Sequence, residues 1–419
     1  MQWSGNIEKL SGWLAAIGLL MIISAIPYGW SAYPRIGAYI LGVGYVFGFV
    51  VGQQWKNLRW HSSNWLYLIM IALYVMLPLR QLFDPTPPTD YFLRQLHRHE
   101  WFLYVGLVGL LGFPETLKRR HVAYVMLLTS VFMLAHCAYM YLGTDEYIGC
   151  AAARRFALLY RHHISSHMVI NLYINAALCL GLSCLCELRQ GWKKVLVGLA
   201  MTLSWTLVVL TQGRIGLLAS LLIIGVGAVY LIYRHNRKWA LVAGVLMLLA
   251  AVPLIMTQPR MKKATMKVEP RTAIWDYSWR MVKQKPVFGY GLSSLSNDYV
   301  EQAYEDAVMY EGFIQPIIEQ DEEFVVQGRT FETHHPHNAF LTYWLAVGIG
   351  GVLLLVALFV FAAMLSAGEN RIFLWLFLLA LFLQCMTEPI GGHLLPQFIA
   401  LLLFVWEKTC NPDTHEHIA

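Results

Sequence analysis

Apolar residues run along the chain in blocks of about 20, which is the length that a helix needs to cross a bilayer. Short polar segments separate these blocks. The pattern predicts an all-α, polytopic membrane protein with about 12 transmembrane helices. We expect these helices at 11–29, 36–53, 64–80, 101–117, 122–143, 167–187, 195–212, 215–233, 239–257, 339–365, 372–388 and 394–407.

One long polar interruption divides this pattern into three regions. Residues 1–257 hold the first predicted membrane helices, and residues 339–419 hold the last ones with a short polar tail. Because long connections of this kind usually carry function, residues 258–338 are expected to form a partly helical domain outside the membrane. Within it, PRTAIWDYSWRMVKQKP (270–286) predicts an amphipathic helix with proline in its first turn, and the glycine-rich turn VFGYGLSS follows.

The distribution of charged residues predicts how the helices are oriented in the membrane. Only 13% of the residues are charged and 58% are hydrophobic, whereas a soluble domain usually carries about twice this charged fraction. Basic residues gather in alternate short loops, which the positive-inside rule places in the cytoplasm together with both termini. They are Lys56, Arg59, Lys118, Arg119, Arg120, Arg189, Lys193, Lys194, Arg234, Arg237 and Lys238. The net charge of +6 therefore reflects topology, and no basic stretch with interleaved aromatic residues suggests nucleic-acid binding.

Polar residues gather at the outer ends of the predicted helices, while the helix centres hold almost no ionisable residue. This distribution argues against an ion-coupled transporter. Arg214 lies in TQGRIGLLAS, at the tip of the hairpin between the spans at 195–212 and 215–233, and Arg271 lies in the first turn of the amphipathic helix. Taken alone, Arg214 could be a snorkelling interfacial arginine and Arg271 a solvated surface arginine.

The stretch THHPHNAFLTYW (333–344) brings histidines to the same outer side, directly before the span at 339–365. Two arginines can bind a pyrophosphate through bidentate hydrogen bonds, and a histidine such as His337 can accept a proton from a hydroxyl. Asn338 is expected to cap the following helix. This set suits group transfer from a diphosphate-activated donor to an alcohol.

The histidines also raise the alternative of a metal site. His334, His335 and His337 could offer three nitrogen ligands. However, the sequence contains no HExxH stretch, and it contains no Asp-x-Asp pair to hold a divalent ion against a diphosphate. We therefore expect neither a metal nor another cofactor.

Four stretches in order, TQGRIGLLAS, PRTAIWDYSW, KPVFGYG and HPHNAFLTYWLAVGIGG, resemble the O-antigen ligase and polymerase superfamily over roughly residues 200–365. The resemblance implies a GT-C-like, metal-independent and inverting glycosyltransferase of the bacterial inner membrane, with its active site facing the periplasm. Ligases of this superfamily move O-antigen polysaccharide from undecaprenyl diphosphate to a sugar hydroxyl of lipid A–core. One departure is Gly213, where many relatives carry a hydroxyl residue before the arginine.

The resemblance also implies roles for individual residues. It places the catalytic positions at Arg214, Arg271 and His337, and the substrate-binding positions at Arg161, His335, Asn338 and Glu388. The expected function is that of an O-antigen ligase. An O-antigen polymerase, with a second lipid-linked glycan as acceptor, is the alternative within the superfamily, and a lipid or glycan transporter is the alternative from another class.

Overall fold

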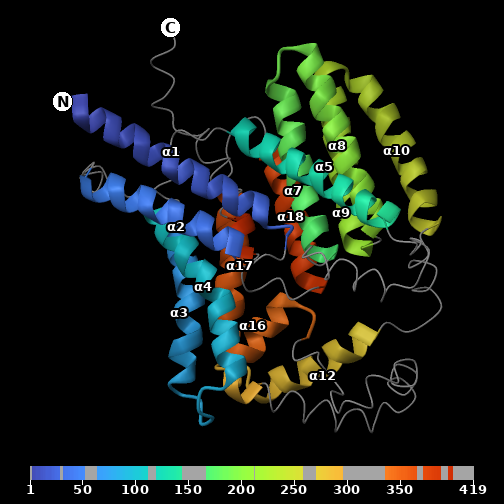
Figure 1. The fold of residues 1–419 in the computed structure, drawn as a ribbon. Coiled ribbons are helices and arrows are strands. Elements are labelled where there is room, and N and C mark those ends of the chain that lie inside the picture. Colours follow the sequence, from blue (N-terminus) through green and yellow to red (C-terminus); the bar gives the residue numbers. More distant parts are fainter. Residues whose placement is uncertain are drawn as a thin grey trace.

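The computed structural model describes the chain as a bundle of helices (Figure 1). The described residues are 2–28, 32–51, 64–111, 119–143, 167–211, 213–257, 270–295, 336–365, 371–387 and 395–399. They form helices and the connections between them, without a β-strand element, which confirms the all-α prediction for these ranges.

Four of the described helices are long and apolar enough to cross a membrane. They are α5 (Arg119–Gly143), α7 (His167–Glu187), α8 (Gly191–Thr211) and α9 (Arg214–His235). Others, such as α10 (Arg237–Thr257), match predicted spans in position. The total of about 12 spans and the division into three regions stay predictions.

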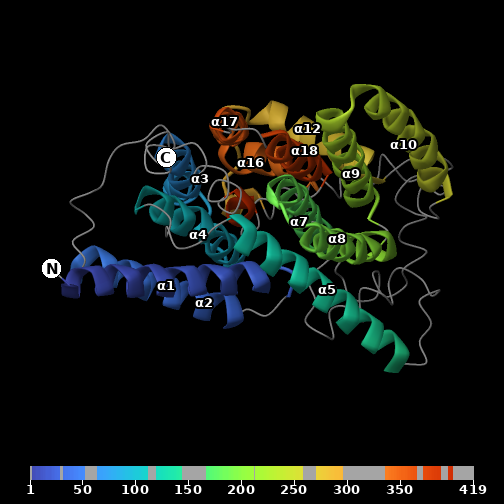
Figure 2. The ribbon, with the colours of Figure 1, turned by 90° about the horizontal axis from the view of Figure 1, so that it is seen from above.

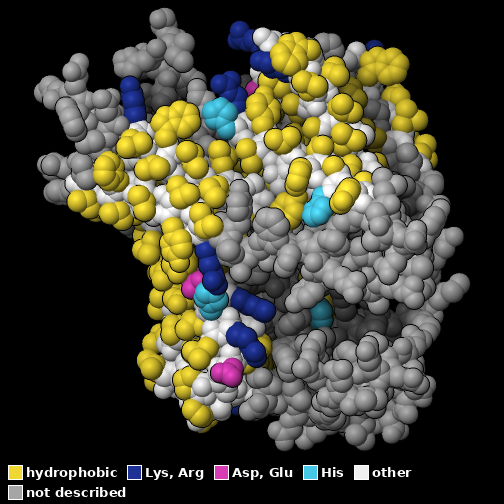
Figure 3. All heavy atoms as spheres, viewed as in Figure 1, with side chains coloured by type: hydrophobic (Ala, Val, Ile, Leu, Met, Phe, Trp, Pro, Cys, Tyr) yellow, Lys and Arg dark blue, Asp and Glu magenta, His cyan; other side chains and the backbone are white. Residues whose placement is uncertain are grey.

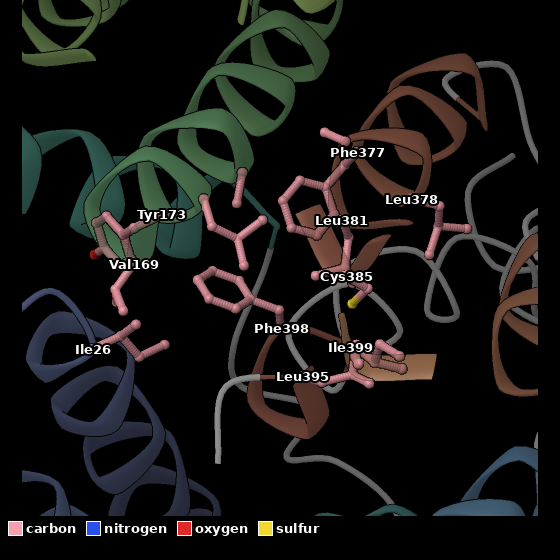
Figure 4. Packing of buried hydrophobic residues seen from close by; sticks show 14 of the residues in the cluster. Ile26, Val169, Tyr173, Phe377, Leu378, Leu381, Cys385, Leu395, Phe398 and Ile399 are labelled. Atoms are coloured by element: carbon pink, nitrogen blue, oxygen red, sulfur yellow. The ribbon is translucent and has the colours of Figure 1, made fainter. Parts of the chain in front are cut away.

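Helix α7 lies at the centre of the bundle (Figure 2). Its side chains are buried along almost the whole helix, because α7 packs against α5, α8, α9 and α18 (Arg371–Thr387). Figure 4 shows Val169 and Tyr173 of α7 facing Ile26 at the end of α1 (Gln2–Ala25), while Phe398 lies between α7 and α18. This apolar core provides the frame from which polar residues project at the two ends.

The N-terminal helices pack in pairs on one flank of the bundle (Figure 2). Helices α1 and α2 (Ala32–Val46) lie side by side, and a π-helix (Phe47–Val51) continues α2. The pair is tight, because a Cβ added to Gly18 would lie 2.5 Å from the backbone nitrogen of Leu41. Helices α3 (Asn64–Gln81) and α4 (Asp90–Leu111) form the next pair.

Helix α4 begins at Asp90, well before the expected start at residue 101. The Thr89 hydroxyl accepts a hydrogen bond from the backbone N–H of Phe92 at 3.2 Å, and Asp90 adds an acidic residue to the first turn. Both features stabilise a helix start. The additional turns bury His99, whose ring makes an edge-to-face contact with Tyr343 at 5.7 Å between centroids. Hydropathy did not reveal these turns because they are amphipathic.

The span predicted at 339–365 is two helices, α16 (Ala339–Val347) and α17 (Ile349–Met364), so the prediction of one continuous helix is wrong. The chain breaks at Gly348, which has a φ of 78°. A Cβ at this position would lie 1.9 Å from the carbonyl oxygen of Val287. Only glycine fits such a backbone angle and such a close approach.

The glycine-rich turn that follows α12 (Pro270–Gln284) causes this break, because it bonds to the end of α16. The N–H groups of Tyr290 and Gly291 donate to the last turn of α16 at 2.7 and 3.0 Å, and Ile349 donates to the carbonyl of Pro286 at 3.0 Å. Gly289 and Gly291 have φ angles of 64° and 84°. The turn therefore satisfies carbonyl groups that a helix end leaves open.

Candidate functional site

Arg214 is the first residue of α9, at the tip of the α8–α9 hairpin. Two buried asparagines of α7 fix this tip. Asn171 accepts a hydrogen bond from the Thr211 hydroxyl at 2.7 Å, and Asn175 donates to the carbonyl of Gly216 at 3.2 Å. Because both asparagines are at most 1% exposed, the backbone that carries Arg214 is tied to the centre of the bundle.

The two glycines beside Arg214 have different local roles. Gly216 lets α9 approach α7, since an added Cβ would lie 2.4 Å from the Cβ of Asn171. Gly213 occupies the N-cap position of α9 and supplies no side-chain cap. The positive end of the helix dipole and the guanidinium group therefore both favour an anion at this tip.

Asn338 fixes the start of α16. Its Oδ1 accepts a hydrogen bond from the N–H of Leu341 at 3.0 Å, which confirms the predicted capping role. Its Nδ2 donates to the carbonyl of Met386, near the end of α18, at 3.0 Å. With both polar atoms bonded to protein and 4% of its surface exposed, Asn338 holds the segment that contains His337 against α18.

Helix α18 joins this segment to α7. The buried Gln384 donates from Nε2 to the carbonyl of Met168, in the first turn of α7, at 2.7 Å. Asn338, α18, α7 and the α8–α9 tip thus form one series of polar contacts. Figure 1 shows the lower ends of α7, α9 and α18 gathered above α16 and α12. We call this part of the molecule, which comprises the α8–α9 tip, the starts of α7 and α16 and the end of α18, the hairpin end.

His337 has a backbone φ of 48°, and it is the one non-glycine residue with positive φ in the described part of the chain. Its side chain is half-buried. Such a conformation costs about 1–3 kcal/mol and persists only where the neighbouring structure enforces it. Here Asn338 is bonded on one side, and on the other side the carbonyl of Pro336 accepts a hydrogen bond from the Trp275 indole at 2.9 Å.

Helix α12 has the predicted amphipathic pattern. Ser278, Met281 and Val282, which share one face of the helix, are at most 2% exposed. Trp279 packs edge to face on Trp344 of α16, with 5.3 Å between the ring centroids. The helix is therefore docked on α16 rather than extended into solvent.

The docking of α12 also places the backbone of Arg271. Arg271 lies four residues, or about one helical turn, before Trp275 on α12. Since Trp275 bonds to Pro336, the backbone of Arg271 lies one helical turn from a residue that contacts the His337 segment. The side chain of Arg271, together with Arg161, His335 and Glu388, lies outside the described residues.

Sequence reasoning missed the buried amides that hold the hairpin end together. Asn171, Asn175 and Gln384 each lie within an apolar block. A polar side chain is costly in such a position unless it is bonded, and this cost is the signal that marks them. Their partners are hydroxyl and carbonyl groups of other helices, which the pattern of one sequence does not identify.

One comparison with known proteins gives a match. Residues 199–356 match the model of a family described as O-antigen ligase. No curated protein matches the chain. The matched range begins within α8 and ends within α17, so it contains the α8–α9 tip, α12 and the His337 segment.

Proposed function

We propose that the chain is an O-antigen ligase of the O-antigen ligase/polymerase superfamily, because residues 199–356 match the model of that family. Membership implies a glycosyltransferase-like membrane enzyme with a lipid-linked glycan substrate. In our proposal the enzyme transfers O-antigen polysaccharide from undecaprenyl diphosphate to a sugar hydroxyl of lipid A–core. The reaction takes place at the periplasmic face of a bacterial inner membrane, with both termini in the cytoplasm.

The observation that carries the proposal is the connected set of buried hydrogen bonds at the hairpin end. It joins the helix start at Arg214 to the strained backbone of His337 through α7 and α18. The starts of α7, α9 and α16 all take part in this set, and helix starts favour anions. A diphosphate bound there would be fixed relative to a proton-accepting histidine, as group transfer requires.

In the proposed reaction, Arg214 and Arg271 bind the diphosphate, with Arg161 as a third contact. His337 takes the proton from the acceptor hydroxyl, and the hydroxyl oxygen attacks the anomeric carbon as the bond from that carbon to the diphosphate breaks. The anomeric configuration inverts, and the arginines stabilise the charge on the leaving diphosphate without a metal ion. His335 and Glu388 contact the sugars, and Asn338 positions His337.

Complementation of a ligase-null Gram-negative strain tests the proposal. The wild-type chain should restore smooth lipopolysaccharide, while His337→Ala and Arg214→Ala should leave rough lipopolysaccharide and accumulate the lipid-linked donor. Gly225→Ala, on the same helix as Arg214 but with only Met247 within reach of the added methyl group, is the matched control. Smooth lipopolysaccharide in both site variants would exclude the proposed roles.

The same strains distinguish the other member of the superfamily. A polymerase would join repeat units on the lipid carrier, so it would restore the length of O-antigen chains in a polymerase-null strain and would not attach them in the ligase-null strain. Binding of labelled donor without turnover in purified protein would instead indicate a transporter.

A further inference from the structure

A cavity of about 680 Å³ lies between α5 and α8, away from the hairpin end. The first halves of both helices line it. Representative lining residues are Arg120, Tyr124 and Leu128 of α5, and Lys193, Leu196 and Ala200 of α8. The cavity opens on the outside of the bundle, since Leu128 is 70% and Leu196 54% exposed.

The position of the cavity along α8 separates it from the candidate active site. Lys193 and Thr211 are 18 residues apart on one helix, which corresponds to about 27 Å. This distance is close to the thickness of the hydrocarbon core of a bilayer, about 30 Å. In an α8 that crosses the membrane, the start of the helix, which lines the cavity, and the tip that carries Arg214 would lie at opposite membrane surfaces.

The lining changes from basic to apolar along the cavity. Arg120 and Lys193 lie at the end of the cavity where α5 and α8 begin, which we call its mouth. There the Lys193 ammonium group is 5.4 Å from the ring centroid of Trp192. Figure 3 shows Lys and Arg side chains gathered at the top of the view, above a broad hydrophobic surface. From Lys193 to Leu203, the last lining residue on α8, the helix rises by about 15 Å, roughly half of the hydrocarbon thickness. Basic and aromatic residues at the starts of the two helices, such as Arg120, Trp192 and Lys193, suit the head-group region of a bilayer.

We propose that this cavity binds an anionic glycerophospholipid from the leaflet opposite the hairpin end. The phosphate group would lie between Arg120 and Lys193, and an acyl chain would follow the apolar stripe toward the middle of the bilayer. The lining extends over about the depth of one leaflet, which matches the length of an acyl chain. A polyprenyl chain is far longer than the lining. The charge of the mouth selects an anionic over a zwitterionic lipid. The inference does not depend on the proposed transferase activity.

Lipid titration of the purified full-length protein, followed by native mass spectrometry, tests the head-group contact. Phosphatidylglycerol should bind more tightly than phosphatidylcholine with the same chains. The double variant Arg120→Gln/Lys193→Gln should weaken phosphatidylglycerol binding about 30-fold and leave phosphatidylcholine unchanged. The control Arg237→Gln/Lys238→Gln removes two exposed cations from the first turn of α10, outside the cavity lining, and should bind as wild type.

A second pair of variants tests the acyl-chain contact without a change of charge. Ala200→Phe fills part of the cavity and should weaken phosphatidylglycerol binding about tenfold. This loss is what we expect when about two methylene groups of the acyl chain are no longer buried. Val195→Phe, at a 69% exposed position of α8 outside the lining, should have no effect. Equal binding of the two phospholipids, equal loss in a control, or displacement of phosphatidylglycerol by polyprenyl phosphate at lower concentration would each overturn the proposal.

Discussion

The two ends of the helix bundle differ in how they use polar residues. At the hairpin end, buried amides bond from helix to helix, and Asn171, Gln384 and Asn338 each have a partner on another element. At the opposite end, where α5, α8 and α10 begin, the cavity lies between α5 and α8, and we call this the cavity end. Basic residues there, such as the exposed Arg120, are accessible and border an apolar groove. The same apolar bundle thus supports a fixed polar arrangement at one surface and an open groove at the other.

This difference has an energetic consequence. Loss of one partner from a buried hydrogen bond leaves a polar group unsatisfied and costs about 1–3 kcal/mol. An exposed substitution usually changes stability by less than about 0.5 kcal/mol. Substitutions at the hairpin end should therefore affect geometry and transfer together, whereas those at the cavity end should leave transfer unchanged.

The largest expected effect separates the chemical role of His337 from its structural role. His337→Gly should lower the transfer rate by about 10²–10⁴. Its Tm should equal or exceed that of wild type, because glycine adopts a φ of 48° without strain. Transfer assays with purified protein and donor, together with thermal unfolding, provide both values. A normal rate would show that His337 is not the base, and a Tm that falls along with the rate would show that its side chain serves the fold.

Arg214 should give the next largest effect. Arg214→Ala should lower the rate by about 10²–10³, the usual loss when a stabilising donor is removed from a transition state. Arg214→Lys should recover little, because an ammonium group cannot form the bidentate contact with a diphosphate. The control at the cavity end is Arg237→Lys, which should keep the wild-type rate. Full recovery by lysine would indicate that charge alone is required.

Several helices and one helix cap could be predicted from the sequence, because hydropathy and capping preference depend on the chemistry of each residue itself. The apolar blocks predicted the positions of helices. The amphipathic pattern of 270–286, with Pro270 in the first turn, predicted α12. Asn338 was predicted as a cap from its place before an apolar run, and the structure confirms this.

The features that sequence reasoning missed all depend on contacts between distant segments. The break at Gly348 exists because the turn after α12 bonds to α16, and both halves of the broken helix are equally apolar. The early start of α4 needs Thr89 as a cap and Tyr343 as a partner for His99. The positive φ of His337 likewise depends on bonds from α12 and α18 to the residues beside it.

A smaller effect is expected where only the hairpin tip is displaced. Gly216→Ala adds a methyl group 2.4 Å from the Cβ of Asn171, so α9 must move away from α7. A displacement of about 1 Å can lower a rate by up to about 10². Gly225→Ala, whose added Cβ would meet only Met247 at 3.9 Å, should behave as wild type in the same assay. An equal loss in both variants would mean that α9 tolerates no added methyl group anywhere.

The smallest expected effect tests the contact between α12 and the His337 segment. Trp275→Phe keeps an aromatic ring but removes the hydrogen bond to the carbonyl of Pro336, a contact worth about 1 kcal/mol. If that bond helps to hold His337 in position, the rate should fall about fivefold. Trp239→Phe on α10, where the side chain is 65% exposed, should leave it unchanged. A loss of stability without a loss of rate would show that α12 only docks on the bundle, and that the hydrogen bonds of Asn338 suffice to position His337.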